Sequence, residues 1–79
     1  MEVKVKLFAT LRECLPESSD GKSCQMDIDE TTTIAQIITK LKIPEDIPKI
    51  ILVNGLSGTI DQTLKEGDEL SIFPPVAGG

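Results

Sequence analysis

The spacing of apolar residues changes along the chain from the period of a strand to that of a helix and back again. Alternating or continuous apolar residues predict four strands, and a set spaced three and four positions apart predicts one amphipathic helix. The strand segments are 2–9, 23–28, 50–53 and 69–73, and the helical segment is 34–41. Two strands, a helix and then further strands predict an α+β fold, with one main helix packed on one face of a mixed sheet.

Local signals predict where the helix begins and which later residues enter the core. Thr33 and Gln36 have the spacing of a capping box at the helix N-terminus. The continuous run 50–53 is typical of a central strand buried on both faces. In the loop-like stretch that follows, Ile60 and Leu64 are expected to anchor the loop in the core.

The chain is short and lacks the usual catalytic side chains. Its 79 residues form one domain with a thin core. The absence of histidine removes the commonest general base and the Ser-His and Cys-His nucleophile pairs. Cys14 and Cys24 are expected to be reduced, structural thiols, and no zinc site is expected from so few ligands. We therefore do not expect the chain to be an enzyme on its own.

The charge balance and the apolar runs limit the classes of partner. A net charge of −5 argues against nucleic acid, which binds basic surfaces, and suits a basic protein partner. No apolar run is long enough to span a membrane, and no leader pattern precedes the first strand. A cytoplasmic protein is the expectation.

The two aromatic residues, Phe8 and Phe73, are predicted to face outward. By strand parity Phe8 shares a face with Lys4 and Lys6, and Phe73 shares one with Ser71. If the first and last strands are neighbours, the two rings form one exposed patch, which is typical of a partner-binding surface. The alternatives are that a bulge or the nearby Pro74 rotates Phe73 inward, or that a loop covers Phe8.

The end of the sequence predicts a flexible tail after a folded domain. Residues 1–75 are expected to form the domain, because Pro74 and Pro75 end strand pairing, and 76–79 the tail. Five residues from Pro75 to Gly79 reach roughly 16 Å at about 3.3 Å per residue, enough to enter a partner's active site. Glycine at 78 and 79 has no Cβ, so the terminal carbonyl is open to attack.

A terminal carboxylate has to be activated before a nucleophile can replace its oxygen. Joining Gly79 to AMP supplies a leaving group, and a sulfur nucleophile can then form a thiocarboxylate whose sulfur is donated elsewhere. These steps need ATP, a base and pockets that the chain must borrow from partners. We expect no permanently bound cofactor, only AMP and then sulfur attached covalently to Gly79.

The sequence resembles the MoaD/ThiS family of ubiquitin-like sulfur carriers, whose fold is the β-grasp of ubiquitin. The resemblance covers the whole chain, and its specific part is the tail, which is similar to that of the small subunit of molybdopterin synthase. Weaker matches are Val5 through Ala9 and Gly67 through Glu69. The tail reads Phe73-Pro74-Pro75-Val76-Ala77-Gly78-Gly79.

The resemblance implies two partners and a pathway. An adenylating enzyme related to ubiquitin-activating enzymes would adenylate Gly79, and the thiocarboxylated tail would enter the large subunit of molybdopterin synthase. Sulfur would pass there to a pterin that later binds molybdenum or tungsten. The residues implied in partner binding are Phe8, Leu56, Phe73, Pro74, Pro75, Val76 and Ala77.

Two other functions stay open from the sequence. The chain can be a sulfur carrier for thiamine synthesis, tRNA thiolation or protein tagging, since those carriers also end in Gly-Gly. It can also be a non-covalent ubiquitin-like interaction module with an incidental Gly-Gly end. The Phe-Pro-Pro segment before the tail favours the pterin pathway over thiamine.

Overall fold

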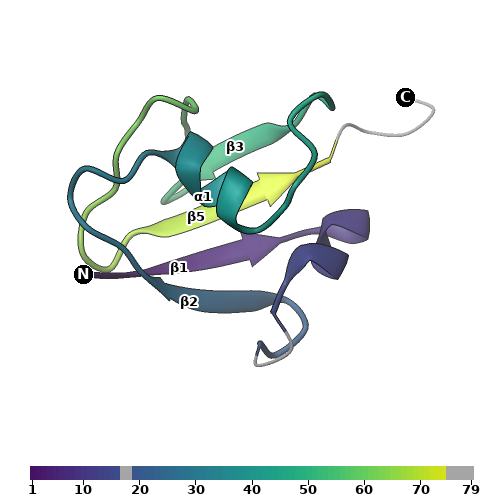
Figure 1. Cartoon of the computed structure of the whole chain (residues 1–79), viewed down its shortest axis with the longest axis horizontal. Helices are drawn as coiled ribbons and strands as arrows, with labels where there is room; N and C mark the ends of the chain where they lie inside the picture. The colour runs from purple at the N-terminus through teal and green to yellow at the C-terminus, as the bar shows by residue number, and fades with distance from the viewer. Residues whose placement is uncertain (17–18, 75–79) are drawn as a thin grey trace.

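The computed structural model describes residues 1–16 and 19–74, which form a mixed five-stranded sheet with the order β2-β1-β5-β3-β4 (Figure 1). β1 pairs antiparallel with β2 and parallel with β5, and β3 pairs antiparallel with β5 and β4. This strand order is that of a β-grasp fold, which the family resemblance implies. The elements are β1 (Glu2–Leu7), a 3₁₀ helix η1 (Ala9–Cys14), β2 (Ser23–Asp27), α1 (Ile34–Lys40), β3 (Ile50–Val53), β4 (Leu56–Ser57) and β5 (Glu69–Phe73).

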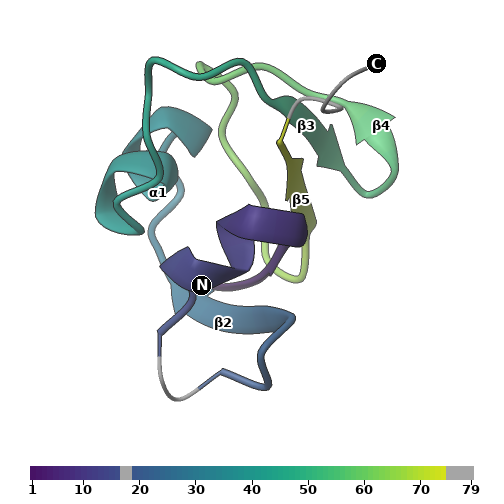
Figure 2. The same cartoon turned by 90° about the vertical axis from the view of Figure 1, so that its right-hand side faces the viewer.

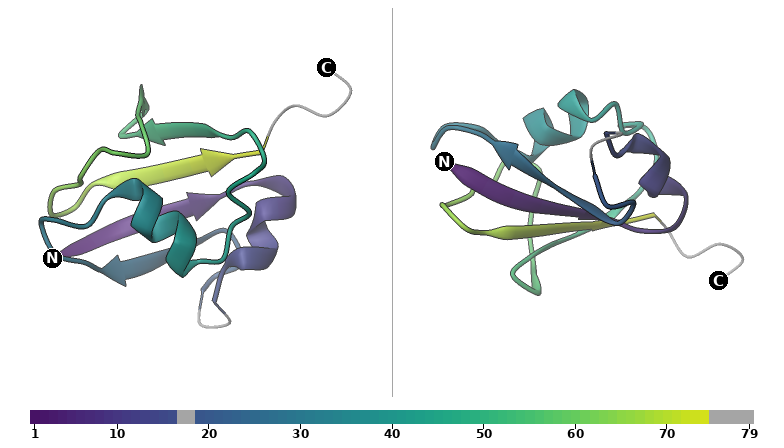
Figure 3. Two further views of the ribbon diagram at one scale, coloured as in Figure 1. Left: turned by 45° about the horizontal axis from the view of Figure 1, so that its top comes forward. Right: turned by 90° about the horizontal axis from the view of Figure 1, so that it is seen from below.

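The core is a single layer between one face of the sheet and the helix α1, which crosses that face (Figure 3). Alternation in the strands turns every second side chain toward α1, and these are the buried ones. The other face of the sheet is uncovered in the described part of the chain. The most completely buried side chains are Val3, Val5, Leu7, Ile34, Ile37, Leu70 and Ile72.

The predicted capping box begins α1. The Thr33 hydroxyl accepts a hydrogen bond from the Gln36 N–H at 3.3 Å, and the Gln36 amide oxygen accepts one from the Thr33 N–H at 2.9 Å. Ile34, Ile37 and Ile38 are buried, as their spacing predicts. The helix prediction from residue period and cap is confirmed.

Ile60 was predicted to be a core anchor, and this is wrong for its side chain, which is 50% exposed. The loop is held instead by its backbone. The Ile60 carbonyl accepts a hydrogen bond from the Ala35 N–H at 2.8 Å, and the Gln62 carbonyl accepts one from the Ile34 N–H at 2.9 Å. These bonds satisfy N–H groups of the first helical turn. Leu64 is buried as predicted.

The strand β3 differs from its prediction on one face. Ile51 and Val53 are buried against the core, whereas Ile50 is 50% exposed and Leu52 is half-buried. A strand in a sheet with one covered face buries only alternate residues, so a continuous apolar run leaves two of its side chains on the open face. The expectation of burial on both faces is corrected accordingly.

The connection from β3 to β4 is a tight hairpin (Figure 2). Asn54 and Gly55 form its turn with positive φ angles of 52° and 82°. Asn-Gly is the preferred pair for such a turn, because both positions need a left-handed backbone. The hairpin gives the sheet an edge strand of only two residues.

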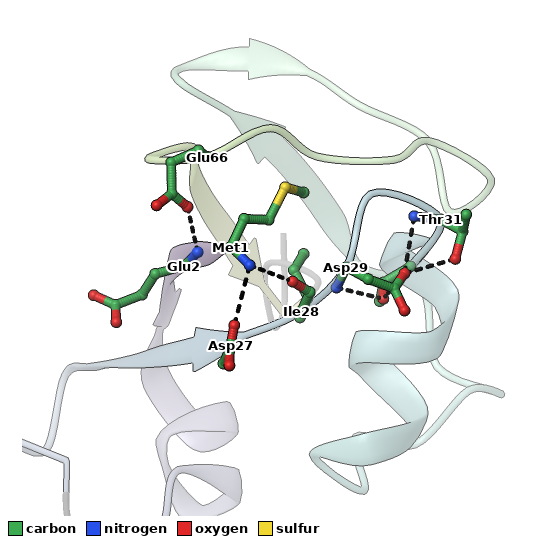
Figure 4. A network of polar contacts seen from close by, with 8 residues as sticks. Met1, Glu2, Asp27, Ile28, Asp29, Thr31 and Glu66 are labelled. Carbon is green, nitrogen blue, oxygen red and sulfur yellow. Dashed lines mark hydrogen bonds and ion pairs between the residues drawn. The ribbon is translucent and has the colours of Figure 1, made fainter.

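Polar contacts close the end of the sheet at which β1 begins (Figure 4). The Met1 amine donates to the Asp27 carboxylate at 3.1 Å and to the Ile28 carbonyl at 2.8 Å. Nearby, Asp29 accepts from the N–H of Thr31 at 2.9 Å. Because β5 runs parallel to β1, it finishes at the opposite end of the sheet.

Candidate functional site

The rings of Phe8 and Phe73 stack on each other at the end of the sheet where β5 finishes. Their centroids are 4.0 Å apart and the planes are inclined by 9°. The parallel register pairs Leu7 with Ile72, so the next residues along both strands meet on the uncovered face. The prediction that the two rings lie together outside the core is confirmed. Each ring is half-buried, because each covers the other.

The outward direction of Phe8 has a local cause. Its backbone is extended, with φ −123° and ψ 151°, so the alternation of β1 continues through it. The chain then turns at Ala9, whose φ of 53° is in the left-handed region. Leu11, in the helical turn that follows, is buried. The backbone therefore bends into η1 only after Phe8 has been placed beside Phe73.

Two residues of β3 extend the aromatic pair into a larger apolar surface. Ile50 lies opposite Phe73 and Leu52 opposite Ser71 in the antiparallel register, and both point to the uncovered face. We call Phe8, Ile50, Leu52 and Phe73 the outer patch. The sequence reasoning missed Ile50 and Leu52, although an apolar run in a sheet with one covered face would have indicated them.

An ion pair borders the outer patch. The Lys6 ammonium lies 2.5 Å from the Glu69 carboxylate, on the same face of the sheet. Hydrogen bonding to Lys6 holds the pKa of the Glu69 carboxyl below its ordinary value. Glu69 therefore keeps its charge at neutral pH, and the pair adds a polar rim to the apolar surface.

Leu56 does not join the outer patch. It lies opposite Val53 in the β3–β4 pairing, so its side chain is on the face of the sheet that α1 covers, at the sheet edge. The side chain is 74% exposed. A partner that contacts both Leu56 and Phe73 would have to reach around the β4 edge.

Of the predicted site residues that follow Phe73, only Pro74 is within the described residues, and it is half-buried. Pro75, Val76, Ala77, Gly78 and Gly79 lie outside them. The chain leaves β5 at the end of the sheet that bears the two aromatic rings.

The cysteines have structural positions. Cys24 is buried on the core face of β2, where burial raises the pKa of its thiol and disfavours the reactive thiolate. Cys14 is half-buried, and its Sγ lies 4.0 Å from the Lys42 carbonyl oxygen. Both are free thiols. Within residues 1–16 and 19–74, no three acidic or sulfur side chains gather as metal ligands would.

Comparison with known proteins establishes the family. The ThiS family model matches residues 5–79, which is nearly the whole sequence. The chain belongs to the ThiS family. The resemblance stated from the sequence is confirmed, and the family is one of small sulfur carriers and ubiquitin-like proteins that do not catalyse reactions themselves.

One curated relative of this ThiS-family chain is a modifier. It is small archaeal modifier protein 3 of Haloferax volcanii, which is 31% identical over 97 residues and is matched over 100% of both chains.

Solved structures agree with the fold. A candidate molybdopterin converting factor subunit 1 from Pyrococcus furiosus has a TM-score of 0.72 and 28% identity, over 95% of this chain and 98% of that one. A chain of the Helicobacter pylori complex of molybdopterin-converting factor subunits 1 and 2 has a TM-score of 0.63 and 21% identity, over 100% of both chains. Caldiarchaeum subterraneum ubiquitin has a TM-score of 0.64 and 17% identity, over 100% of this chain and 98% of that one. The fold is therefore the ubiquitin-like β-grasp.

The helices of this ThiS-family protein are short. In the described ranges, neither α1 nor η1 has the length and apolar character that a membrane-crossing helix requires.

Proposed function

We propose that this ThiS-family protein carries sulfur on its terminal residue, Gly79, as the small subunit of molybdopterin synthase. The observation that supports this best is the stacked pair Phe8–Phe73 at the base of the Gly-Gly tail. An aromatic surface beside the point where the tail leaves the sheet would dock a partner while the tail enters that partner's active site.

In this proposal, the Gly79 carboxylate is first activated as an acyl adenylate and then converted into a thiocarboxylate. An oxygen of the Gly79 carboxylate attacks the α-phosphorus of ATP on the adenylating enzyme, which forms the acyl adenylate and releases pyrophosphate. Sulfide (HS⁻) delivered by a sulfurtransferase then attacks the acyl carbon, displaces AMP and loses its proton, which leaves a thiocarboxylate. On the large subunit, the thiocarboxylate sulfur would form a bond to a carbon of the pterin precursor as an oxygen substituent leaves that carbon. Water would then hydrolyse the resulting thioester, which leaves the sulfur on the pterin and returns the Gly79 carboxylate.

The role of this chain in these steps is binding and presentation. The outer patch would pack on the partner, and the Lys6–Glu69 pair would orient the contact at its rim. Pro74 and Pro75 cannot donate to a sheet ladder, so they would direct the tail away from β5. Gly78 and Gly79 would pass a narrow channel that a side chain would block.

A second function, protein tagging, is favoured by the relative named as a modifier. The same Gly79 adenylate would then be attacked by a lysine amine of a target protein, which forms an isopeptide bond and releases AMP. Both functions need the same activation and differ in the nucleophile that follows. The relative with the name of a molybdopterin converting factor subunit supports the first.

Mass spectrometry of the intact chain tests the shared step. The full chain is incubated with ATP, its activating enzyme and a sulfur source, and the mass of its C-terminal peptide is measured. The expected result is an adenylate, followed by the exchange of one oxygen for sulfur at Gly79. A chain lacking Gly79, which ends in the Gly78 carboxylate, is the control, and an equal gain in that control would show that the mechanism does not need Gly79.

The acceptor separates the two functions. The thiocarboxylated chain is mixed with the large subunit and pterin precursor, and separately with a lysate of the source cells. Sulfur transfer to the pterin supports the first function. If isopeptide-linked adducts that need Gly79 form and no sulfur reaches the pterin, the function is protein tagging and not sulfur donation.

A further inference from the structure

In the described part of the chain, three residues other than glycine have a left-handed backbone. They are Ala9, Lys42 and Asn54, with φ angles of 53°, 61° and 52°. Asn54 belongs to the Asn-Gly turn, and asparagine adopts this region more readily than most residues. Lys42 follows Leu41, the C-cap of α1, and helices commonly end with such a residue. Ale9 has neither explanation, and it lies next to the aromatic pair.

The turn at Ala9 takes the chain from one face of the sheet to the other. Phe8 stacks on Phe73 outside the core, whereas Leu11, three residues later, is 3% exposed within it. An extended Ala9 would continue the line of β1 beyond the sheet, and Leu11 would not reach the core. The left-handed backbone makes the reversal possible within two exposed residues, Ala9 and Thr10.

Contacts after the turn hold it in place. The Leu11 N–H donates to the Phe8 carbonyl at 3.1 Å, and the Arg12 Nε–H donates to the Leu7 carbonyl at 3.4 Å. The helical turns of η1 pack on β1 and β5 at the end of the sheet where β5 finishes (Figure 1). A strained backbone persists only where its surroundings fix it, and these contacts do so for Ala9.

The strain at Ala9 and the stacking of Phe8 are comparable in size. A left-handed backbone is unfavourable for alanine, because Cβ comes close to the following carbonyl oxygen. A stacked aromatic pair is stabilised by a similar amount beyond the area that it buries. Rotation of the backbone at Phe8 and Ala9 would relieve the strain while Leu11 stays buried, but it would carry the Phe8 ring away from Phe73.

We propose that Ala9 is a positioning residue for partner docking, and that its left-handed backbone holds Phe8 in the outer patch. How well the residue at position 9 tolerates this backbone sets the fraction of free molecules that present the complete patch. The apparent affinity of a partner falls in proportion to that fraction. The inference rests on the proposed function for its partner, the large subunit of molybdopterin synthase.

Ala9→Val tests the proposal by raising the strain. Valine is β-branched and is a rare occupant of the left-handed region. The variant should bind the large subunit about tenfold more weakly, because most free molecules leave the docking arrangement. Calorimetric titration with the full chain measures the affinity.

Lys42→Val is the matched control. It places the same side chain on a second left-handed backbone, which follows α1 on the covered side of the sheet. The Lys42 carbonyl oxygen meets η1 at Cys14, the end farther from Phe8, with 4.0 Å between the oxygen and Sγ. This variant should lose stability as Ala9→Val does, yet bind the large subunit as the unmodified chain does.

The two rings report on the position of Phe8 without any partner. Phe8 and Phe73 are the only aromatic residues in the sequence, so the aromatic NMR signals belong to them alone. Rings with centroids 4.0 Å apart should give strong nuclear Overhauser effects between their protons. Ala9→Val should lose most of this inter-ring signal, and Lys42→Val should keep it.

Ala9→Gly and Ala9→Asn keep the test decisive if the valine variant does not fold. Glycine and asparagine both accept a left-handed backbone with less strain than alanine. Both variants should retain the inter-ring signal and bind the large subunit equally well or up to about twofold more tightly. Clearly weaker binding by either one would overturn the proposal.

Two further outcomes contradict a positioning role for Ala9. One is an undiminished inter-ring signal in folded Ala9→Val. The other is an equal loss of affinity in Ala9→Val and Lys42→Val, which would reduce the effect to general destabilisation. If the unmodified chain does not bind the large subunit, the proposed function fails, and the inter-ring signals still decide whether Ala9 positions Phe8.

Discussion

Phe8 and Phe73, the only aromatic residues in the sequence, face away from the core. The core loses little by this, because Leu7 and Ile72, one position earlier on each strand, are completely buried in it. Stacking covers part of each ring and contributes about 0.5–1.5 kcal/mol beyond the area that it buries. A protein that keeps its aromatic residues on an uncovered face has a surface suited to a partner.

Replacing Phe73 with aspartate should separate binding from folding. We expect Phe73→Asp to weaken binding of the molybdopterin synthase large subunit by at least about 30-fold, the scale of an aromatic interface hot spot. The cost in unfolding free energy should stay near 1–2 kcal/mol, because the side chain is only half-buried. Calorimetric titration and urea denaturation measure the two quantities.

A matched control is Gln25→Asp, which places the same charge on the same face of the sheet but on the edge strand β2. This variant should bind the large subunit as the unmodified chain does. If Phe73→Asp unfolds the domain instead, Phe73 is a core residue and the partner surface lies elsewhere.

Asp68 should make stability depend on pH. Its carboxylate accepts from the Asn54 side-chain amide at 2.9 Å and from the Lys65 N–H at 2.8 Å, and these bonds lower the pKa of Asp68 below 3.8. A lowered folded-state pKa stabilises the fold above the unfolded pKa, and this contribution is lost as the pH falls through the folded value. Unfolding free energy should therefore decline below about pH 4.

The variant Asp68→Asn isolates this contribution. Its unfolding free energy should be about 1 kcal/mol lower at neutral pH, because the amide nitrogen cannot accept from the Lys65 N–H. Its unfolding free energy should also decline less steeply in acid, because the variant lacks the titrating carboxyl. Urea denaturation at a series of pH values measures both. An unchanged acid slope would show that other carboxylates, such as Asp20 and Asp29, account for the dependence.

At the scale of elements, α1 depends on its surroundings. Seven residues are too few for an isolated helix in water, since nucleation is costly. Its first turn is completed from two sides, by the capping box of Thr33 and Gln36 and by carbonyls of the loop at 60–62. The loop that follows β4 is thus held by its backbone.

Thr33→Ala should destabilise the domain by about 1 kcal/mol, because one N–H of the first turn loses its acceptor. Thr33→Ser keeps the hydroxyl and should cost only a few tenths of that amount. Urea denaturation of the pair gives the difference. Equal stabilities for the alanine and serine variants would show that the loop carbonyls alone sustain the helix start.

At the scale of the whole molecule, the sheet presents two opposed surfaces. The outer patch lies on the uncovered face where β5 finishes, and α1 packs over the core on the opposite face. One compact domain can thus offer a docking surface for the tail's partner while the helix keeps the core closed.

Removal of Gly78 and Gly79 should abolish activation without affecting the fold. We expect the unfolding free energy to change by less than about 0.5 kcal/mol, because both glycines follow the predicted domain, residues 1–75. Adenylate formation should become undetectable by mass spectrometry. A large loss of stability in this variant would mean that the tail packs on the domain and is not free to enter a partner.

The sequence by itself determined the elements and their inward faces. The two-residue period of Val3, Val5 and Leu7, the helical period after Thr33 and the Asn54-Gly55 turn are local properties. Each depends on residues close in the chain, so periodicity and turn chemistry are enough to predict them. The same parity correctly placed Phe8 and Phe73 outside the core.

Only the tertiary structure decided which surfaces stay uncovered. The run 50–53 is equally compatible with burial on one face or on both, and Ile60 with either side-chain or backbone anchoring. The position of α1 on a single face leaves Ile50 exposed, and the pairing with Val53 puts Leu56 on the face away from Phe73. Such outcomes depend on contacts between residues distant in the chain, which local patterns do not contain.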